Sequence, residues 1–282
     1  MARTACAAAV VLTMLFSAAA EARVSSSVAA LQVALRAERL YGGTVDGIAG
    51  PGTRAAIEAL QREHQLAVDG IAGPQTRRAL GRRGRPALGS RPLTTGRRGW
   101  DVAALQFLLA RHGFPSGPID GGLGPRTAAA LTRFQTWAGL AADGVAGPGT
   151  LGALRRPPPV SVLRFARPLA VPIGDGFGPR GATFHTGVDF PAPAGTPVGA
   201  AGRGCVSFAG WADGYGKLVV VQHRLGMTSW YAHLSRIAVR VGECVVAGDR
   251  IGRVGATGHA TGPHLHFELR LRDAAVDPLT GL

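Results

Sequence analysis

The residues best suited to chemistry lie in the C-terminal half of this 282-residue chain, which holds six of its eight histidines. His264 and His266 alternate with apolar residues. In a strand, residues i and i+2 share a face about 6.7 Å apart, so both imidazoles would point into one site. His185 and Asp189 lie four residues apart, with Gly187 between them to bend the chain. A catalytic zinc site keeps three nitrogen or oxygen ligands from the protein, so His185, Asp189 and one or both of His264 and His266 can form one.

Four further histidines and one glutamate need a separate interpretation. Glu268 continues the same alternation, which leaves open a general base or a carboxylate that simply lies along the strand face. His223 ends an apolar run and His259 lies in a glycine-rich loop, so we expect both at surface loops or strand ends rather than at a metal. His64 and His112 occupy unrelated positions in the first half, and we expect both at the surface.

The segments around these histidines read as strands. Short β-branched runs are punctuated by glycine and no helical period persists, so the half of the chain from about residue 168 is predicted to be a β domain. The predicted runs are 204–208, 217–223, 227–233, 250–254 and 264–272.

An internal repeat fills the first half, where residues 28–80 return as residues 102–154 at a constant offset of 74 positions. Val28, Leu31 and Leu35 have helical spacing, and their counterparts keep it. The element Asp-Gly-x-x-Gly-Pro-x-Thr occurs twice in each copy, where Asp-Gly forms a turn and Pro fits the first position of a helix. Each copy is therefore predicted to form three short helices, with these turn residues architectural. The four elements begin at Asp46, Asp69, Asp120 and Asp143.

Arginine dominates the charge of the chain. The formal net charge is +14, and Lys217 is the single lysine among 31 basic residues. Several arginines lie in a predicted linker at 82–98, and a second, Pro-rich and stiffer linker follows at 155–167. Such a chain favours polyanions. Nucleic acid is disfavoured, because the sequence has no recognisable nucleic-acid fold and no interleaved stacking aromatics.

The N-terminus predicts export. A basic start, an apolar run over residues 7–20 and a small-x-small end describe a cleavable signal at residues 1–22. A membrane anchor is the alternative, but the run is shorter than the roughly 18 residues that span a bilayer. Two cysteines remain after cleavage, and in an oxidising compartment we expect Cys205 and Cys244 to pair. Two separate buried thiols are the alternative.

Both halves resemble known families. The order of Leu-Gln, Asp-Gly-x-x-Gly-Pro-x-Thr, a second Leu-Gln or Phe-Gln and a second Asp-Gly element resembles the peptidoglycan-binding domain found beside many wall hydrolases. The C-terminal half resembles the lysostaphin-type zinc metallopeptidases, endopeptidases that cut peptidoglycan cross-links. The residues that carry the second resemblance are 177–180 (Phe-Gly-Pro-Arg), 185–190 (His-Thr-Gly-Val-Asp-Phe), 214–216 (Gly-Tyr-Gly), 230–235 (Trp-Tyr-Ala-His-Leu-Ser), 257–258 (Thr-Gly) and 261–268 (Thr-Gly-Pro-His-Leu-His-Phe-Glu).

This resemblance assigns roles that spacing leaves open. It implies that His185, Asp189 and His266 hold Zn²⁺, while His233 and His264 remain free for catalysis. It implies hydrolysis by water whose pKa zinc lowers to about 7, with zinc polarising the scissile carbonyl. One of the two free histidines would take the proton of the water or stabilise the developing oxyanion.

Together these observations predict an exported, multidomain α+β protein of the cell wall or periplasm. We expect a monomeric zinc endopeptidase that hydrolyses peptide cross-links of peptidoglycan, with no nucleic-acid partner and no stable membrane insertion. A catalytically silent wall-binding regulator of another hydrolase and a zinc hydrolase of a different peptide are the alternatives. The predicted segments are a signal at 1–22, repeats at 24–81 and 99–154, linkers at 82–98 and 155–167, and a metallopeptidase domain at 168–282.

Overall fold

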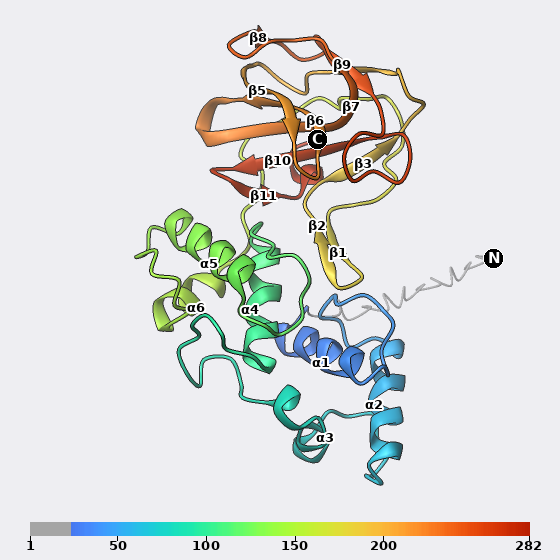
Figure 1. The fold of residues 1–282 in the computed structure, drawn as a ribbon, viewed down its shortest axis with the longest axis vertical. Helices are drawn as coiled ribbons and strands as arrows, with labels where there is room; N and C mark the ends of the chain where they lie inside the picture. The colour runs from blue at the N-terminus through green and yellow to red at the C-terminus, as the bar shows by residue number, and fades with distance from the viewer. Residues whose placement is uncertain (1–23) are drawn as a thin grey trace, which may run out of the picture.

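The computed structural model describes residues 24–282, which form a helical half followed by a β half (Figure 1). The predicted multidomain α+β class is confirmed. The signal predicted at residues 1–22 lies outside the described residues. Within residues 24–282, no helix combines the length and the apolar character needed to cross a membrane.

Each repeat copy forms three helices, as predicted. The first copy contains α1 (Ser26–Ala37), α2 (Pro51–Glu63) and α3 (Pro74–Ala79), and the second contains α4 (Trp100–Arg111), α5 (Pro125–Trp137) and α6 (Pro148–Leu154). Helices α2, α3, α5 and α6 begin at the proline of an Asp-Gly element, because proline has no N–H for a helix start to leave unpaired.

A buried glutamine explains why each Asp-Gly element is placed as it is. Nε2 of Gln106 donates to Asp120 Oδ1 (2.9 Å), Gly122 O (3.0 Å) and Thr127 Oγ1 (3.1 Å), and its Oε1 accepts from the Gly121 N–H (2.8 Å). One side chain therefore holds the whole loop. The same arrangement recurs at Gln32, Gln61 and Gln135.

The two copies form one helical unit, because α1 packs against α4. Phe107 of α4 is fully buried in the core of the first copy together with Trp100. The predicted linker at 82–98 begins within a short 3-10 helix, η1 (Gly81–Gly84), and lies bound to this unit. Arg91 pairs with the fully buried Asp101 at 2.7 Å, and the Gly96 N–H donates to the Leu123 carbonyl. The segment is thus fixed in place, unlike a solvated tether.

The β half is built around one antiparallel sheet. Its main path runs β11-β10-β7-β6-β5-β8, with β3 paired to β10, β9 paired to β7, and β4 paired to β9. The predicted runs correspond to β5 (Gly204–Ala212), β6 (Gly216–Gln222), β7 (Met227–Ile237), β9 (Arg250–Val254) and β10 (His264–Leu271). The remaining strands are β1 (Gly178–Arg180), β2 (Thr183–His185), β3 (Val188–Pro191), β4 (Pro197–Gly199), β8 (Cys244–Val245) and β11 (Ala274–Val276). Two short 3-10 helices, η2 (Arg224–Gly226) and η3 (Pro278–Thr280), complete this half.

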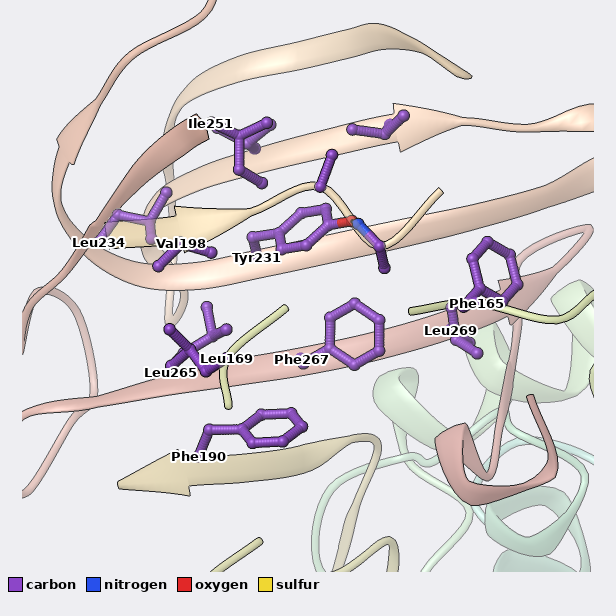
Figure 2. Close-up of a cluster of buried hydrophobic side chains, with 14 of the residues drawn as sticks. Phe165, Leu169, Phe190, Val198, Tyr231, Leu234, Ile251, Leu265, Phe267 and Leu269 are labelled. Carbon is purple, nitrogen blue, oxygen red and sulfur yellow. The ribbon is translucent and has the colours of Figure 1, made fainter. Parts of the chain in front are cut away.

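The core of the β half lies against one face of this sheet. Tyr231, Phe267 and Phe190 come from neighbouring strands and are fully buried there (Figure 2). Phe165 joins the same core, and its N–H donates to the Gly281 carbonyl at 2.8 Å. The end of the predicted linker at 155–167 is therefore packed on the β domain.

Two histidines expected at the surface are buried. His223 is 7% exposed, and its ring nitrogens bond the Arg203 carbonyl and Ser229 Oγ, which in turn bonds Tyr231. His112 is 2% exposed and bonds the Leu154 carbonyl. The local sequence around each histidine did not show that segments distant in the chain would bury its ring.

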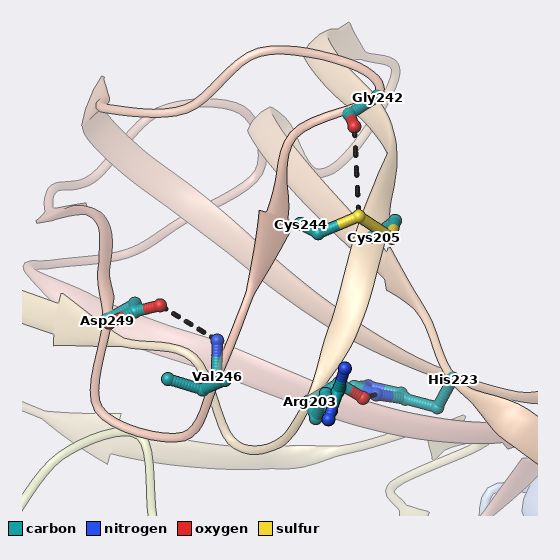
Figure 3. The surroundings of a disulfide bond; sticks show 7 residues. All are labelled: Arg203, Cys205, His223, Gly242, Cys244, Val246 and Asp249. Atoms are coloured by element: carbon teal, nitrogen blue, oxygen red, sulfur yellow. Dashed lines mark hydrogen bonds between the residues drawn. A yellow bond between two sulfur atoms is a disulfide. The ribbon is translucent and has the colours of Figure 1, made fainter.

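The predicted disulfide is present. Cys205 of β5 and Cys244 of β8 are opposite each other in the strand pairing and are bonded (Figure 3). In the same view, His223 lies against the carbonyl of Arg203, directly before β5. The disulfide therefore fastens the two-residue strand β8 to the edge of the main sheet.

Candidate active site

One cavity of the β domain collects all the predicted site residues. Its volume is about 550 Å³, and β2, β3, β7 and β10 each contribute to its lining. The five predicted residues that line it are His185, Asp189, His233, His264 and His266. Spacing indicated four of these residues and the family resemblance added His233, and the fold brings all five to a single place.

Three potential ligand atoms face one another at the base of this cavity. His185 Nε2 lies 3.1 Å from Asp189 Oδ1 and 3.0 Å from His266 Nδ1, and the last two atoms are 2.8 Å apart. His185 ends β2, while Asp189 of β3 and His266 of β10 are direct partners in the sheet. Gly187 is required between them, because a Cβ there would lie 2.3 Å from the Phe267 carbonyl oxygen.

Hydrogen bonds on the outer ring nitrogens of His185 and His266, which face away from the converging atoms, decide which nitrogen of each ring carries the proton. Nδ1 of His185 must donate to the Gly176 carbonyl (2.7 Å), and Nε2 of His266 must donate to the Glu268 carboxylate (2.9 Å), since neither acceptor carries a proton to give. In their neutral forms, both rings then present lone pairs to the Asp189 carboxylate. Three acceptors at this separation repel one another unless a cation lies among them, and two nitrogens with one oxygen form a donor set that suits zinc. The residues present therefore fit zinc.

Titration behaviour shows the same attraction for positive charge. Burial opposes the charged form of His266, but its hydrogen bonds with Asp189 and Glu268 raise its pKa to about 9. Burial also opposes ionisation of Asp189, yet the bonds with His185 and His266 hold the pKa of that carboxyl well below its usual range. The cluster stabilises a cation strongly enough to outweigh its own desolvation.

His233 and His264 face each other on the other side of the cavity, with ring centroids 4.8 Å apart. Each is anchored through Nδ1, which donates to the Thr257 carbonyl in His233 (2.7 Å) and to the Gly262 carbonyl in His264 (2.9 Å). Their Nε2 atoms remain available to a substrate or a water. Burial lowers the pKa of His233, which keeps its imidazole neutral near pH 7.

The backbone at His233 is itself unusual. Its φ of +61° lies in the left-handed region, where a residue with a Cβ is strained, although it belongs to β7. Hydrogen bonds on two sides hold this conformation, from the His233 N–H to the Tyr215 carbonyl and from Nδ1 to Thr257. Strain held in place in this way is characteristic of functional sites.

Glu268 hydrogen-bonds His266 on the side of the ring that faces away from Asp189. Its carboxylate is fully buried, and beside His266 it accepts hydrogen bonds from Thr186, Tyr215 and Arg270. Burial raises the pKa of Glu268, but the Arg270 guanidinium and His266 lower it by more, so the carboxyl stays ionised. A carboxylate on the far nitrogen of a ligating histidine fixes its tautomer and raises its basicity. The alternation of residues 264, 266 and 268 was the signal for this role.

Sequence reasoning named no role for Arg180, which also borders the cavity. Its guanidinium lies 3.1 Å from Asp189 Oδ2 and 3.0 Å from Asp175 Oδ2. The Asp189 oxygen that faces the two imidazoles is Oδ1, so Arg180 holds the opposite oxygen. Arg180 thereby orients the carboxylate, much as Gly176 and Glu268 orient the rings.

A second cavity lies in the helical unit, between α1 and the start of α4. Its volume is about 1000 Å³, its floor includes Val33 and Trp100, and six arginines border it. Two of these arginines pair with carboxylates, Arg83 with Glu38 and Arg91 with Asp101. The other four have no carboxylate partner within residues 24–282 and are Arg82, Arg85, Arg97 and Arg98.

Curated relatives match about a third of the chain. The DD-carboxypeptidase/endopeptidase Mpg of Neisseria meningitidis is 46% identical over 96 residues, and the peptidoglycan DD-endopeptidase ShyA of Vibrio cholerae is 44% identical over 95. Each match covers 34% of this chain, and the chain spans about a fifth (22%) of the length of each relative. Among solved structures, the catalytic domain of lysostaphin from Staphylococcus simulans is 39% identical, covering 39% of this chain and 90% of its own, with a TM-score of 0.37.

Family models match both halves. The model "Peptidase family M23" matches residues 183–278, which include every residue described above in the β-domain cavity except Asp175, Gly176 and Arg180. The model "Putative peptidoglycan binding domain" matches residues 24–80 and 98–154, the two repeat copies. Residues 183–278 therefore form a peptidase family M23 domain, which follows two peptidoglycan-binding domains.

Proposed function

We propose that this protein is a zinc-dependent endopeptidase that hydrolyses peptide cross-links of peptidoglycan. The observation that carries the proposal is the convergence of three potential ligand atoms, from His185, Asp189 and His266, beside two histidines whose Nε2 atoms make no hydrogen bond within residues 24–282. The match to family M23 supports the same reaction class. Export to the cell wall or periplasm and a monomeric state belong to this proposal.

In this mechanism His185 Nε2, Asp189 Oδ1 and His266 Nδ1 would hold the zinc ion. Bound zinc would supply Lewis acidity, lowering the pKa of water and polarising the scissile carbonyl. His233 and His264 act as the proton-transfer pair, because a neutral imidazole anchored at Nδ1 accepts a proton at Nε2 and can return it to the leaving amine. Their backbone anchors keep both rings turned toward the cavity.

The two repeats, at 24–81 and 99–154, are proposed to bind the wall. A linker at 82–98 joins them to each other, and a second linker at 155–167 joins them to the metallopeptidase domain at 168–282. The arginine-bordered cavity gives this binding a physical basis. Guanidinium groups recognise carboxylates and phosphates through paired hydrogen bonds, and four such groups have no carboxylate partner within residues 24–282. Attachment of the enzyme to an insoluble substrate raises its effective concentration there.

Alanine variants separate zinc ligands from proton-transfer residues. Replacing His185, Asp189 or His266 should remove both bound zinc and the release of amino groups from purified peptidoglycan. His233→Ala and His264→Ala should keep zinc near one equivalent and lose activity by about a hundredfold or more, because each removes one proton-transfer group. Metal analysis and amino-group release are measured together, with the exposed His64→Ala as control.

The rival interpretation predicts a different result for the wild-type protein. A folded, zinc-loaded wild type that releases no amino groups from several wall types would exclude the enzyme and favour a silent regulator. Activity that disappears with a chelator and returns with zinc would exclude the regulator. Loss of zinc from His264→Ala would contradict the proposed ligand set.

Glu268→Gln tests the support of His266. The amide keeps the shape of the carboxylate but loses its charge, so we expect zinc affinity to fall about 10- to 100-fold, the effect usual for such a carboxylate. Competition against a chromophoric chelator gives the affinity, and circular dichroism checks that the variant is folded. Glu63→Gln, on an exposed side chain, is the matched control. Unchanged zinc affinity in Glu268→Gln would refute the orienting role.

Replacing the four unpaired arginines by glutamine tests the wall-binding cavity. We expect binding to purified peptidoglycan to fall about tenfold or more at low salt, because charge-assisted hydrogen bonds are lost, and cleavage of a soluble peptide to persist. The control removes the same charge from exposed arginines of the β domain, at positions 224, 236, 240 and 250. Equal losses in sedimentation assays of both variants would show that net charge alone attracts the protein to the wall.

A further inference from the structure

The hairpin β1–β2 stands apart from the rest of the β domain. Its two strands pair only with each other, from Gly178 opposite His185 to Arg180 opposite Thr183, and form a separate two-stranded sheet. A two-stranded hairpin on its own is marginally stable in water. Packing of Phe177 against Phe184 supports its base, but its tip needs another partner.

Both repeat copies supply that partner. The Val45 N–H donates to the Gly181 carbonyl at 2.8 Å, and the Ile119 N–H donates to the Ala182 carbonyl at 2.7 Å. Val45 and Ile119 are equivalent residues, 74 positions apart, and both are buried. The helical unit thus holds the tip from two sides with the same backbone group, and Figure 1 shows the hairpin extending from the β domain toward α1 and α4.

These two donors are rigid because of the loops that they precede. Val45 is followed by the Asp-Gly element that Gln32 holds, and Ile119 by the element that Gln106 holds. The hydrogen bonds to the tip come from the first element of each copy and not from the second elements, held by Gln61 and Gln135. Each copy therefore contains one loop next to the hairpin contact and a second loop of the same Asp-Gly-x-x-Gly-Pro-x-Thr pattern that does not hydrogen-bond the hairpin.

The other end of the hairpin reaches the proposed metal site. His185 is its last residue, and Arg180 beside the tip bonds Asp189, a second proposed ligand. A shift of the tip therefore moves one proposed ligand directly and the carboxylate of another through Arg180.

The strand that carries His266 is fixed to the same helical unit. The indole N–H of Trp137 donates to the Leu271 carbonyl (3.1 Å) at the end of β10, and the Ala275 N–H of β11 donates to the Gly113 carbonyl (3.1 Å). Gly113 is needed there, because a Cβ would lie 2.2 Å from the Ala275 oxygen. The helical unit thus contacts the strand pairs β1–β2 and β10–β11, which carry His185 and His266, two of the three proposed ligands.

We propose that the paired repeats support the candidate metal site as well as binding the wall, and that they position His185 by clamping the tip of the β1–β2 hairpin. Val45 and Ile119 are then positioning residues that act through His185. This inference rests on the proposed role of His185 as a zinc ligand. The clamp predicts an effect that tethering to the wall does not, because damage to the clamp should lower the affinity of the site for zinc.

Ala182→Trp in the full chain tests the clamp directly. Ala182 is half-buried at the tip, and an indole there should separate the hairpin from Ile119. We expect hydrogen exchange of amides 183–185 to quicken about tenfold or more in the metal-free protein. Zinc affinity should fall about tenfold. Ala194→Trp, in an exposed turn of the β domain, is the control. Exchange and zinc affinity equal to those of the control would overturn the clamp.

A matched pair of glutamine variants separates the clamp from general loss of stability. Gln106→Leu and Gln135→Leu remove the same buried side chain from the contacting and the non-contacting loop of one copy, so both should lower the melting temperature similarly. Only Gln106→Leu should lower the affinity for zinc and speed up hydrogen exchange in the hairpin. An equal loss of zinc affinity in the two glutamine variants would overturn the proposal. If the wild type binds no zinc yet hairpin exchange still responds to Ala182→Trp, the metal proposal fails and the clamp stands.

Discussion

The candidate metal site depends on hydrogen bonds made on the far sides of its ligands. Gly176 and Glu268 take the outer N–H groups of His185 and His266, so in the neutral rings the inner nitrogens are the ones that offer lone pairs. Arg180 holds the outer oxygen of Asp189, leaving the inner one to the site. Three lone pairs are thereby held 2.8–3.1 Å apart, an arrangement that is unfavourable without a cation and favourable with one.

The surrounding fold keeps these outer groups in place by burial. Glu268 is fully buried among Tyr215 and Arg270, and the guanidinium of Arg270 lies 3.9 Å from the centre of the Trp230 ring. Burial also raises the pKa of Tyr215 to about 12, so it stays a hydrogen-bond donor. A buried network of this kind is rigid when every member is satisfied. The hairpin that carries His185 lacks such burial at its tip, where the repeats take over the same task.

The sequence was sufficient for features that repeat or alternate. The offset of 74 residues revealed two equivalent helical copies, and the alternation at 264 and 266 placed two imidazoles on one strand face. Other features depend on contacts between distant segments, which no local pattern records. The burial of His112 and His223, the short strands of the β1–β2 hairpin and the contact of Val45 and Ile119 with its tip belong to this group. Glu268 belongs partly to each group, since the alternation in the sequence placed it on the strand face but did not reveal its hydrogen-bond partners.

X-ray absorption and anomalous diffraction at the zinc edge of the zinc-loaded protein test the central claim most directly. The account predicts one zinc ion bound by two imidazole nitrogens and one carboxylate oxygen, with metal–ligand distances of about 2.0–2.2 Å. The anomalous peak should lie between His185 Nε2, Asp189 Oδ1 and His266 Nδ1. Zinc bound elsewhere, or bound through His233 or His264 in place of one of these three, would contradict the account.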